Sequence, residues 1–215
     1  MKDIILFDLD GTITDPKVGI TKSVQYALKY FDIHIGDPDE LCNFIGPPLR
    51  ESFMEFYGLS MEQAELATAK YRERFVATGI YENEIYDGMA ELLESLKSSG
   101  KTLLLATSKP TVFAERVLSH FNIDKYFSFI SGSELNGERS DKFEVITYAL
   151  ENAAIKNVEK CVMIGDRKYD IIGARAAGVS NIGVLYGYGD KSELEEAGAD
   201  YLARDVAELG RLLNG

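Results

Sequence analysis

Short apolar runs that alternate with amphipathic helical patterns limit most strongly how this chain can fold. The runs are rich in Ile, Leu, Val and Phe and are too short for helices, which is typical of buried strands. Such strands, separated by helices, predict a parallel sheet with helices on both faces. The expected strands are Ile4–Phe7, Thr102–Ala106, Phe127–Ser131, Cys161–Ile164 and Asn181–Leu185, and the expected helices are Met89–Lys97, Val112–Phe121, Phe143–Ala153 and Ile171–Ala177. We therefore predict an α/β fold with a Rossmann-like, doubly wound core.

One long segment interrupts this alternation. Within residues 15–84 no run reads convincingly as a strand, and the pattern favours helices instead. The stretch FIGPPL, at Phe44–Leu49, contains a glycine and two prolines that forbid a continuous helix. The expected helices are Val18–Tyr30, Leu49–Tyr57 and Met61–Thr78. We therefore predict that residues 1–14 and 85–215 form the α/β core and that residues 15–84 form an inserted α-helical cap.

The composition narrows the classes of function. A length of 215 residues can hold a core domain with an insertion, and a net charge of −12 speaks against a broad basic face for nucleic acid or anionic membranes. We expect no membrane span and no signal peptide, because the apolar runs are too short for either. Cys42 and Cys161 are expected to be reduced thiols. The prediction is a cytoplasmic protein, monomer or homodimer, that acts on a small molecule.

Paired aspartates follow two of the expected strands. Asp8 and Asp10 end the run in DIILFDLDGT, and Asp166 and Asp170 follow the run in CVMIGDRKYD. Because the carboxyl ends of parallel strands meet at one edge of a sheet, these carboxylates are expected to lie close together. Their mutual repulsion calls for a hard cation, and Mg²⁺ is the usual one. Mg²⁺ held among carboxylates in turn favours phosphate chemistry.

The two pairs suggest different tasks. Beyond the strand end, Gly11 permits a turn that points Asp8 into the crevice as a nucleophile, with Asp10 as proton donor to the leaving oxygen. Asp166 would bind the metal, and Asp170 would hold the metal or its waters. Two plainer alternatives remain: the first pair could form a polar turn, and Asp170 could simply cap a helix. The neighbouring Arg167 is expected to be solvated.

Three further polar residues could bind a phosphoryl group. Thr107 and Ser108 follow the second expected strand, where a hydroxyl beside helix N–H groups can hold phosphate. The alternative is that one of them merely caps the next helix. Lys142 stands at a helix N-terminus, against the macrodipole, which suggests an anionic partner such as a phosphoryl oxygen or Asp8. A surface lysine whose dipole cost is offset by Asp141 is the other interpretation.

With these motifs in view, the whole chain resembles the haloacid dehalogenase-like hydrolase superfamily, in its phosphoglycolate phosphatase-like and 5′-nucleotidase-like branch with an α-helical cap. The tail GVLYGYGDKSELEEAGADYLARDVAEL and the FIGPPL segment are similar to sequences of that branch. The resemblance implies that Asp8 is the nucleophile, Asp10 the general acid and base, and Thr107 and Lys142 the phosphate-binding pair. It also implies that Mg²⁺ is held at Asp8, Asp166, Asp170 and the Asp10 backbone carbonyl.

The expected function is a magnesium-dependent phosphatase that acts on a small phosphomonoester through an aspartyl-phosphate. Phosphoglycolate and nucleoside 5′-monophosphates are both candidate substrates. Arg50 in the expected cap could bind a carboxylate or second anionic group of the substrate, although it could equally be a solvated helix residue. The alternative enzyme is a phosphosugar mutase of the β-phosphoglucomutase kind. A binding protein without turnover is disfavoured, because it would need neither Asp8 nor Asp10.

Overall fold

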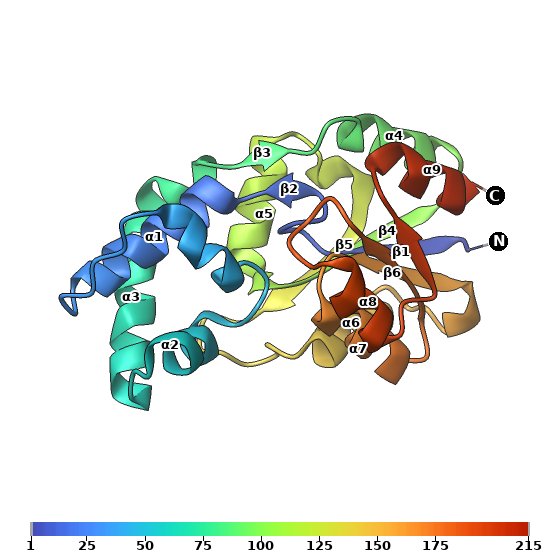
Figure 1. Cartoon of the computed structure of the whole chain (residues 1–215). Coiled ribbons are helices and arrows are strands. Elements are labelled where there is room, and N and C mark those ends of the chain that lie inside the picture. Colours follow the sequence, from blue (N-terminus) through green and yellow to red (C-terminus); the bar gives the residue numbers. More distant parts are fainter. Residues whose placement is uncertain (1, 215) are drawn as a thin grey trace. The chain divides into compact units, whose positions relative to one another are not determined.

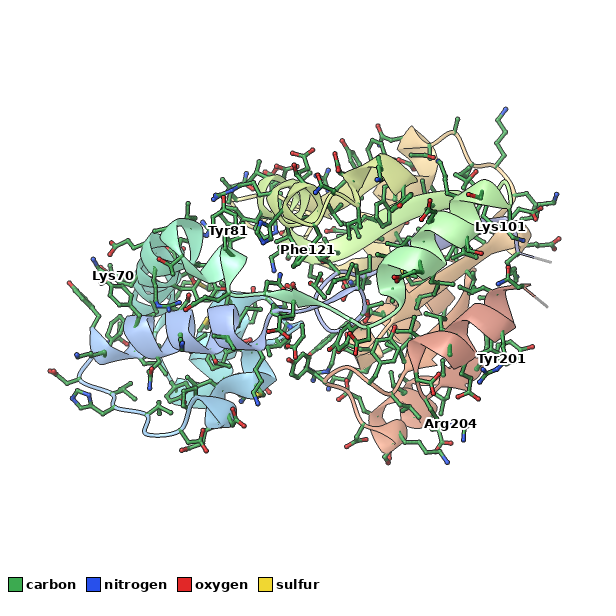
Figure 2. The ribbon with its side chains drawn as sticks, turned by 90° about the horizontal axis from the view of Figure 1, so that it is seen from above. Lys70, Tyr81, Lys101, Phe121, Tyr201 and Arg204 are labelled. Atoms are coloured by element: carbon green, nitrogen blue, oxygen red, sulfur yellow. The ribbon has the colours of Figure 1, made fainter. Side chains whose placement is uncertain are left out.

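The computed structural model describes residues 2–214 and divides the chain into two compact units (Figure 1). The first unit holds the chain as far as Asp15 and again from Ile85 onward, and the second unit holds Pro16–Glu84. Figure 2 marks the second unit by Lys70 and Tyr81, and the first by Lys101 and Tyr201. The chain therefore crosses from one unit to the other twice. That the second unit acts as a cap stays a prediction.

The first unit is built on a six-stranded sheet whose order is β5-β4-β1-β6-β7-β8. Every neighbouring pair in it is parallel. The chain starts in the middle at β1, adds strands on one side, and then returns to add strands on the other side. This is the doubly wound order, and the predicted α/β fold class is confirmed. The strands are β1 (Ile4–Phe7), β4 (Thr102–Pro110), β5 (Phe127–Ser133), β6 (Cys161–Gly165), β7 (Ser180–Val184) and β8 (Tyr201–Ala203).

Helices cover both faces of this sheet. Figure 1 shows α4 and α9 on one face and α6, α7 and α8 on the other. On the second of these faces, Leu6, Leu104 and Met163 of the central strands pack with Val145 and Ile146 of α6 in one fully buried cluster. Burial of this apolar surface fixes the strand ends relative to one another. The helices are α4 (Met89–Ser98), α5 (Thr111–His120), α6 (Lys142–Asn152), α7 (Lys168–Ala176), α8 (Lys191–Ala197) and α9 (Val206–Asn214).

The predicted strands and helices of the core are all present; β1 has the predicted ends, and the ends of the others differ by at most four residues. The largest difference is in β4, which continues past the expected end at Ala106 as far as Pro110. The sequence reading also left out β8, α8 and α9. β8 is short, and Tyr201 on it is exposed, so it lacks the apolar run that marked the other strands.

The second unit is helical by itself. It contains α1 (Lys17–Lys29), α2 (Leu49–Tyr57) and α3 (Met61–Ala77), together with 3₁₀ helices at Pro38–Phe44 and Gly79–Tyr81. Phe44 packs against the rings of Phe53, Phe56 and Tyr57, which joins the first 3₁₀ helix to α2. At the two chain crossings, β2 (Thr14–Asp15) pairs with β3 (Glu84–Ile85). The expectation that residues 15–84 contain no strand is therefore wrong at its two ends.

Across residues 2–214, none of the helices combines the length and the apolar character that crossing a membrane requires.

Candidate active site

Strand register brings the predicted acidic residues to one edge of the sheet. Phe7, the last residue of β1, is level with Leu105 on β4 and with Ile164 on β6. The next residue, Asp8, keeps this alignment, because its amide donates to the Ile164 carbonyl at 2.9 Å. Asp8 and Asp166 therefore leave neighbouring strands at the same carboxyl edge, where the winding direction reverses.

Three carboxylates meet at this edge. Oxygen atoms of Asp8, Asp166 and Asp170 all lie within 4.8 Å of one another, and the residues are at most 4% exposed. Glycines make room for them. A Cβ on Gly11, whose φ is +81°, would lie 2.2 Å from an Asp166 oxygen, and one on Gly165 would lie 2.1 Å from the Asp170 carboxyl carbon. Neither contact is sterically possible, so the cluster depends on glycine at both positions.

Lys142 lies between two of these carboxylates, those of Asp8 and Asp170. Its Nζ is 3.0 Å from Asp8 Oδ1 and 2.7 Å from Asp170 Oδ1, and it donates to the Ala106 carbonyl at 3.2 Å. Burial opposes the charge on this lysine, but Asp170 and Asp8 outweigh it and raise the pKa of the ammonium. Asp141 caps α6 by accepting from the Phe143 amide at 2.8 Å. Lys142 is thus no surface residue but a buried cation that orients the cluster.

Asp170 contributes to the cap of α7 and also belongs to the acidic cluster. Its Oδ2 accepts from the Arg167 amide at 3.1 Å at the start of α7, while its Oδ1 faces Lys142. Burial raises the pKa of this carboxyl to about 6; Lys142 works in the opposite direction and Asp8 adds to the rise. The helix cap therefore fixes the side chain in the orientation that the cluster uses.

The surroundings of Asp166 indicate whether a cation fits the acidic cluster. Its Oδ2 accepts from the Tyr188 amide at 2.7 Å, but its Oδ1 is buried with no hydrogen-bond partner. Burial, followed by repulsion from Asp170 and Asp8, raises the pKa of Asp166 well above its usual value. A buried acceptor without a donor is costly unless a cation occupies the position. An oxygen-only donor set with this orphaned atom fits Mg²⁺.

A second lysine, Lys109, enters the site from β4 and was missed in the sequence. Its Nζ lies 2.6 Å from Asp10 Oδ1, and both side chains are nearly buried, at 6% and 11% exposure. Burial raises the pKa of Asp10 despite the opposing charge of Lys109. Residues two apart on a strand share a face, so Lys109 follows Thr107 once β4 extends to Pro110. Because the predicted strand ended at Ala106, the sequence did not indicate that Lys109 shares a face with Thr107.

The two hydroxyl residues of β4 differ in their surroundings. Thr107 is 2% exposed, and its Oγ1 accepts from the Lys109 amide at 3.3 Å. The Ser108 carbonyl accepts from the Ser133 hydroxyl at 2.7 Å, which anchors the backbone to β5. Neither hydroxyl caps α5, because the N-cap position of that helix is Pro110. Of the two alternatives for Thr107, capping the helix is wrong, whereas phosphate binding stays a prediction.

Two arginines considered in the sequence lie outside the acidic cluster. Arg50 belongs to α2 of the second unit, where its guanidinium is 3.6 Å from Glu51 and 3.9 Å from Glu65. Its contact with substrate stays a prediction. Arg167 was expected to be solvated, but it is mostly buried and donates to Glu193 at 2.9 Å. That expectation was wrong, because α8 supplies an acidic partner that is distant in sequence.

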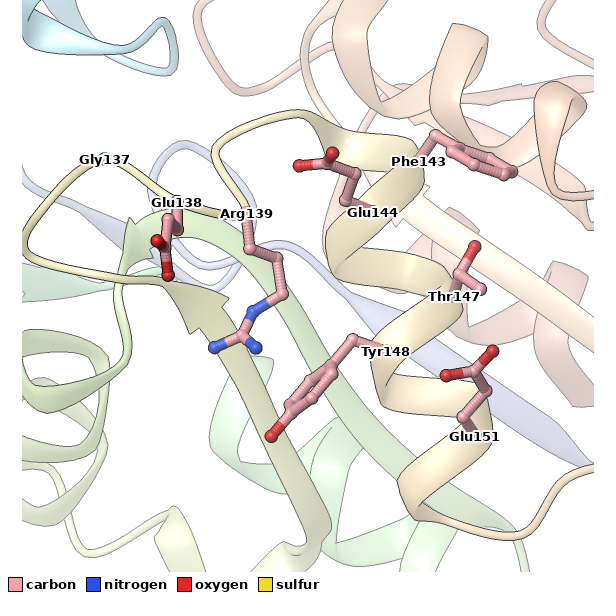
Figure 3. Close-up of a pocket in the computed structure, with 8 residues that line it drawn as sticks. All are labelled: Gly137, Glu138, Arg139, Phe143, Glu144, Thr147, Tyr148 and Glu151. Atoms are coloured by element: carbon pink, nitrogen blue, oxygen red, sulfur yellow. The ribbon is translucent and has the colours of Figure 1, made fainter.

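A hollow on the surface of the first unit lies beside α6 and is separate from this cluster (Figure 3). Arg139 crosses it, with its guanidinium carbon 3.7 Å from the Tyr148 ring centre and its Nε 2.9 Å from the Gly132 carbonyl. None of the predicted site residues lines it. Its lining residues are Gly137, Glu138, Arg139, Phe143, Glu144, Thr147, Tyr148 and Glu151.

Comparison with known proteins agrees with this geometry. Residues 5–184 match the model of the haloacid dehalogenase-like hydrolase family. The chain is 48% identical to a 5′-nucleotidase of Pseudomonas aeruginosa, over 97% of this chain and 94% of that one. It is 38% identical to the tyrosine-protein kinase PtkA of Mycobacterium tuberculosis, over 86% of this chain but only 63% of that protein.

Among solved structures, a predicted phosphatase from Clostridium acetobutylicum matches with a TM-score of 0.97 and 48% identity. The match covers 100% of this chain and 99% of that one. The fold described above is thus shared with this predicted phosphatase. The chain belongs to the haloacid dehalogenase-like hydrolase family, and the resemblance seen in its sequence is confirmed.

Proposed function

We propose that this protein is a magnesium-dependent phosphatase that hydrolyses a small phosphomonoester through an aspartyl-phosphate on Asp8. The family match and the similarity to proteins named as phosphatases support its general class, a phosphoric monoester hydrolase. The observation that carries the proposal is the buried cluster of Asp8, Asp166 and Asp170 around Lys142. Among the described residues, four nearby carboxylates, counting Asp10, form ion pairs with two lysines, so a divalent cation would balance the remaining charge.

The residues that would hold the cation are Asp8, Asp166 and Asp170, with the Asp10 carbonyl as a further candidate. When bound, Mg²⁺ supplies charge that offsets the phosphoryl oxygens and lets an anionic nucleophile approach an anionic substrate. Lys142 contributes in the same sense, because its ammonium is fixed beside Asp8 at 3.0 Å. Thr107 is buried and follows Ala106, whose carbonyl accepts from Lys142, so it is suited to donate its hydroxyl to a phosphoryl oxygen.

The reaction proceeds in two displacements. In the first, a carboxylate oxygen of Asp8 attacks phosphorus, an O–P bond forms, and the bond to the leaving alkoxide breaks. In the second, water attacks the same phosphorus, inorganic phosphate leaves, and the Asp8 carboxylate is restored. Lys142 keeps Asp8 directed toward the crevice in both steps. Asp166 and Asp170 remain in place throughout, since backbone amides hold both of them.

Asp10 moves the proton that the two displacements require. It gives a proton to the leaving oxygen in the first step and takes one from water in the second. Its raised pKa favours a carboxyl that can be protonated in the enclosed site. Lys109, which contacts Asp10, sets the position of this carboxyl. An alkoxide without such a donor is a poor leaving group, so Asp10 is essential for phosphomonoesters of simple alcohols.

Nucleoside 5′-monophosphates are the first substrates to test. The relative that is 48% identical over almost the whole chain is named a 5′-nucleotidase, which supports this choice. Phosphoglycolate remains the second candidate from the family resemblance. In either case we assign selectivity to the second unit, in which Arg50 would meet an anionic group of the substrate beyond its phosphate.

A phosphate-release screen with Mg²⁺ tests the function. It should include nucleoside 5′-monophosphates, phosphoglycolate, sugar phosphates, pyrophosphate and a phosphotyrosine peptide. We expect release from a nucleotide or phosphoglycolate at a kcat/KM at least about tenfold above that for the other compounds. Isomerisation of a sugar phosphate without net phosphate release would instead support the mutase alternative. Absence of turnover on every compound would contradict both.

A further inference from the structure

The loop that follows β7 contacts the acidic cluster through its backbone. The Tyr188 amide donates to Asp166 Oδ2 at 2.7 Å, and this is the hydrogen bond that leaves Asp166 Oδ1 directed into the cluster. The glycines on either side are packed tightly. A Cβ on Gly187 would lie 2.3 Å from the Gly11 carbonyl, and one on Gly189 would lie 2.0 Å from the Asp166 carbonyl. The loop therefore has little freedom to move without moving Asp166.

The two tyrosine side chains of the same loop contact residues near the chain crossings instead. The Tyr188 hydroxyl donates to Asp15 Oδ1, and Asp15 is the last residue before the chain enters the second unit. The Tyr186 hydroxyl donates to the Thr12 carbonyl at 3.1 Å, and its ring packs edge-on against Tyr86 with centres 4.9 Å apart. Both chain crossings are thus anchored to this one loop.

We infer that Tyr188 is a positioning residue that links the chain crossing at Asp15 to the metal-binding carboxylate of Asp166. The inference rests on the proposed function, because it treats Asp166 as a cation ligand. One residue holds both partners: its backbone orients the carboxylate and its phenol is tied to the crossing. Loss of the phenol bond leaves the amide in place but releases the loop from Asp15.

The link is a coupling free energy, so it acts in both directions. Whatever holds Asp15 in place improves the cation site, and a bound cation strengthens the Tyr188–Asp15 bond by the same factor. The alternative is that the Tyr188 phenol stabilises the fold without any effect on the cation site. Because Tyr188→Phe keeps the backbone amide on Asp166, it should leave cation affinity unchanged if the phenol only stabilises the fold.

The experiment measures Mn²⁺ binding to the full-length protein, as the free-ion signal in electron paramagnetic resonance, for the wild type, Tyr188→Phe, Asp15→Ala and the double variant. We expect each single substitution to weaken Mn²⁺ binding about three- to tenfold, and the double variant to be no weaker than the singles, since all three lack the same bond. The matched control is Tyr201→Phe, which removes a phenol that is 60% exposed on β8 and should bind as the wild type does.

Unchanged affinity in Tyr188→Phe, or single effects that add in the double variant, would overturn the inference. If one single variant fails to fold, as judged by circular dichroism, the other decides the matter alone. The proposed function fails separately: a wild-type protein that neither binds Mn²⁺ nor releases phosphate would remove the metal site itself. Wild-type binding with an unaffected Tyr188→Phe variant would remove only the coupling.

Discussion

The two units of this molecule differ in charge burial: the first contains a deeply buried charged cluster, and the ion pairs of the second are more exposed. In the first unit, Asp166 and Lys142 are 1% and 5% exposed; the Tyr188 amide holds Asp166, and two carboxylates of the cluster hold Lys142. In the second unit, charged pairs such as Lys17–Asp39 lie at the surface, with side chains 37% and 62% exposed. Exposed ion pairs contribute little to stability. Buried charged groups have shifted pKa values, which are common at functional sites. From this contrast we expect the chemistry to reside in the first unit, and the charges of the second unit to affect at most which substrate is bound.

The largest effect should come from Asp8→Asn. The amide has the shape of the carboxylate but cannot form the aspartyl-phosphate, so we expect kcat to fall at least about 10⁴-fold while the fold is retained. Phosphate release and circular dichroism measure the two outcomes. Asp124→Asn, an exposed position of the same unit, is the control and should leave kcat unchanged. Hydrolysis that survives in Asp8→Asn would rule out Asp8 as the nucleophile.

Removal of the cation should produce the next-largest loss. With EDTA the acidic cluster is left with uncompensated charge, and we expect turnover to fall more than about 100-fold and to return on addition of excess Mg²⁺. EDTA already saturated with Mg²⁺ is the control for effects of the chelator itself. Full activity of a chelated, dialysed protein would show that the cluster works without a divalent ion.

Lys109→Met should produce a smaller loss. The substitution keeps the aliphatic stem but leaves Asp10 without its partner, so we expect kcat to fall about 10- to 100-fold with little change in KM. Lys101→Met is a matched control. Lys101 is equally buried in the first unit but donates to the Lys2 carbonyl at 2.7 Å and lies 3.6 Å from Asp3, outside the acidic cluster. If both variants lose activity equally, buried lysines matter here for stability only.

The metal-free protein should lose stability as the pH rises from about 4 to about 6. The pKa of Asp170 is raised from 3.8 to about 6, so in this window the folded state binds more protons than the unfolded state, and the free energy of unfolding falls as the proton leaves. Urea unfolding in EDTA at several pH values measures this. Asp170→Asn should lose about 1 to 3 kcal/mol less than the wild type across the window. Parallel curves for the two proteins would contradict the raised pKa.

The smallest effect should come from the second unit. Arg50→Ala should raise KM for the natural substrate about three- to tenfold and leave KM for p-nitrophenyl phosphate nearly unchanged, because the small substrate lacks the second anionic group. Lys70→Ala, a cation of α3 that pairs with Glu73, is the control. Equal changes for both substrates would mean that Arg50 does not distinguish them, and would weaken the contrast between the units.

Much of the core could be read from the sequence, because burial on both faces leaves a strong local signal. Strands such as β1 and β6 are continuous apolar runs, and the aspartates that follow them are marked by position alone. Lys109 and the loop carrying Tyr188 gave no such signal. Their importance depends on partners about 100 residues or more away, Asp10 and Asp15, and no local pattern encodes such a contact.

By itself the sequence determined the α/β class and singled out the four aspartates and Lys142 as candidate site residues, since hydrophobic period and strand-end position are local properties of the chain. Only the tertiary structure decided what each charge faces. It placed Lys142 between Asp8 and Asp170, gave Asp10 the partner Lys109, and tied Asp166 to the Tyr188 amide. The physical reason is that the charge state and orientation of a buried group are set by its neighbours in space, and folding brings those neighbours from distant parts of the chain.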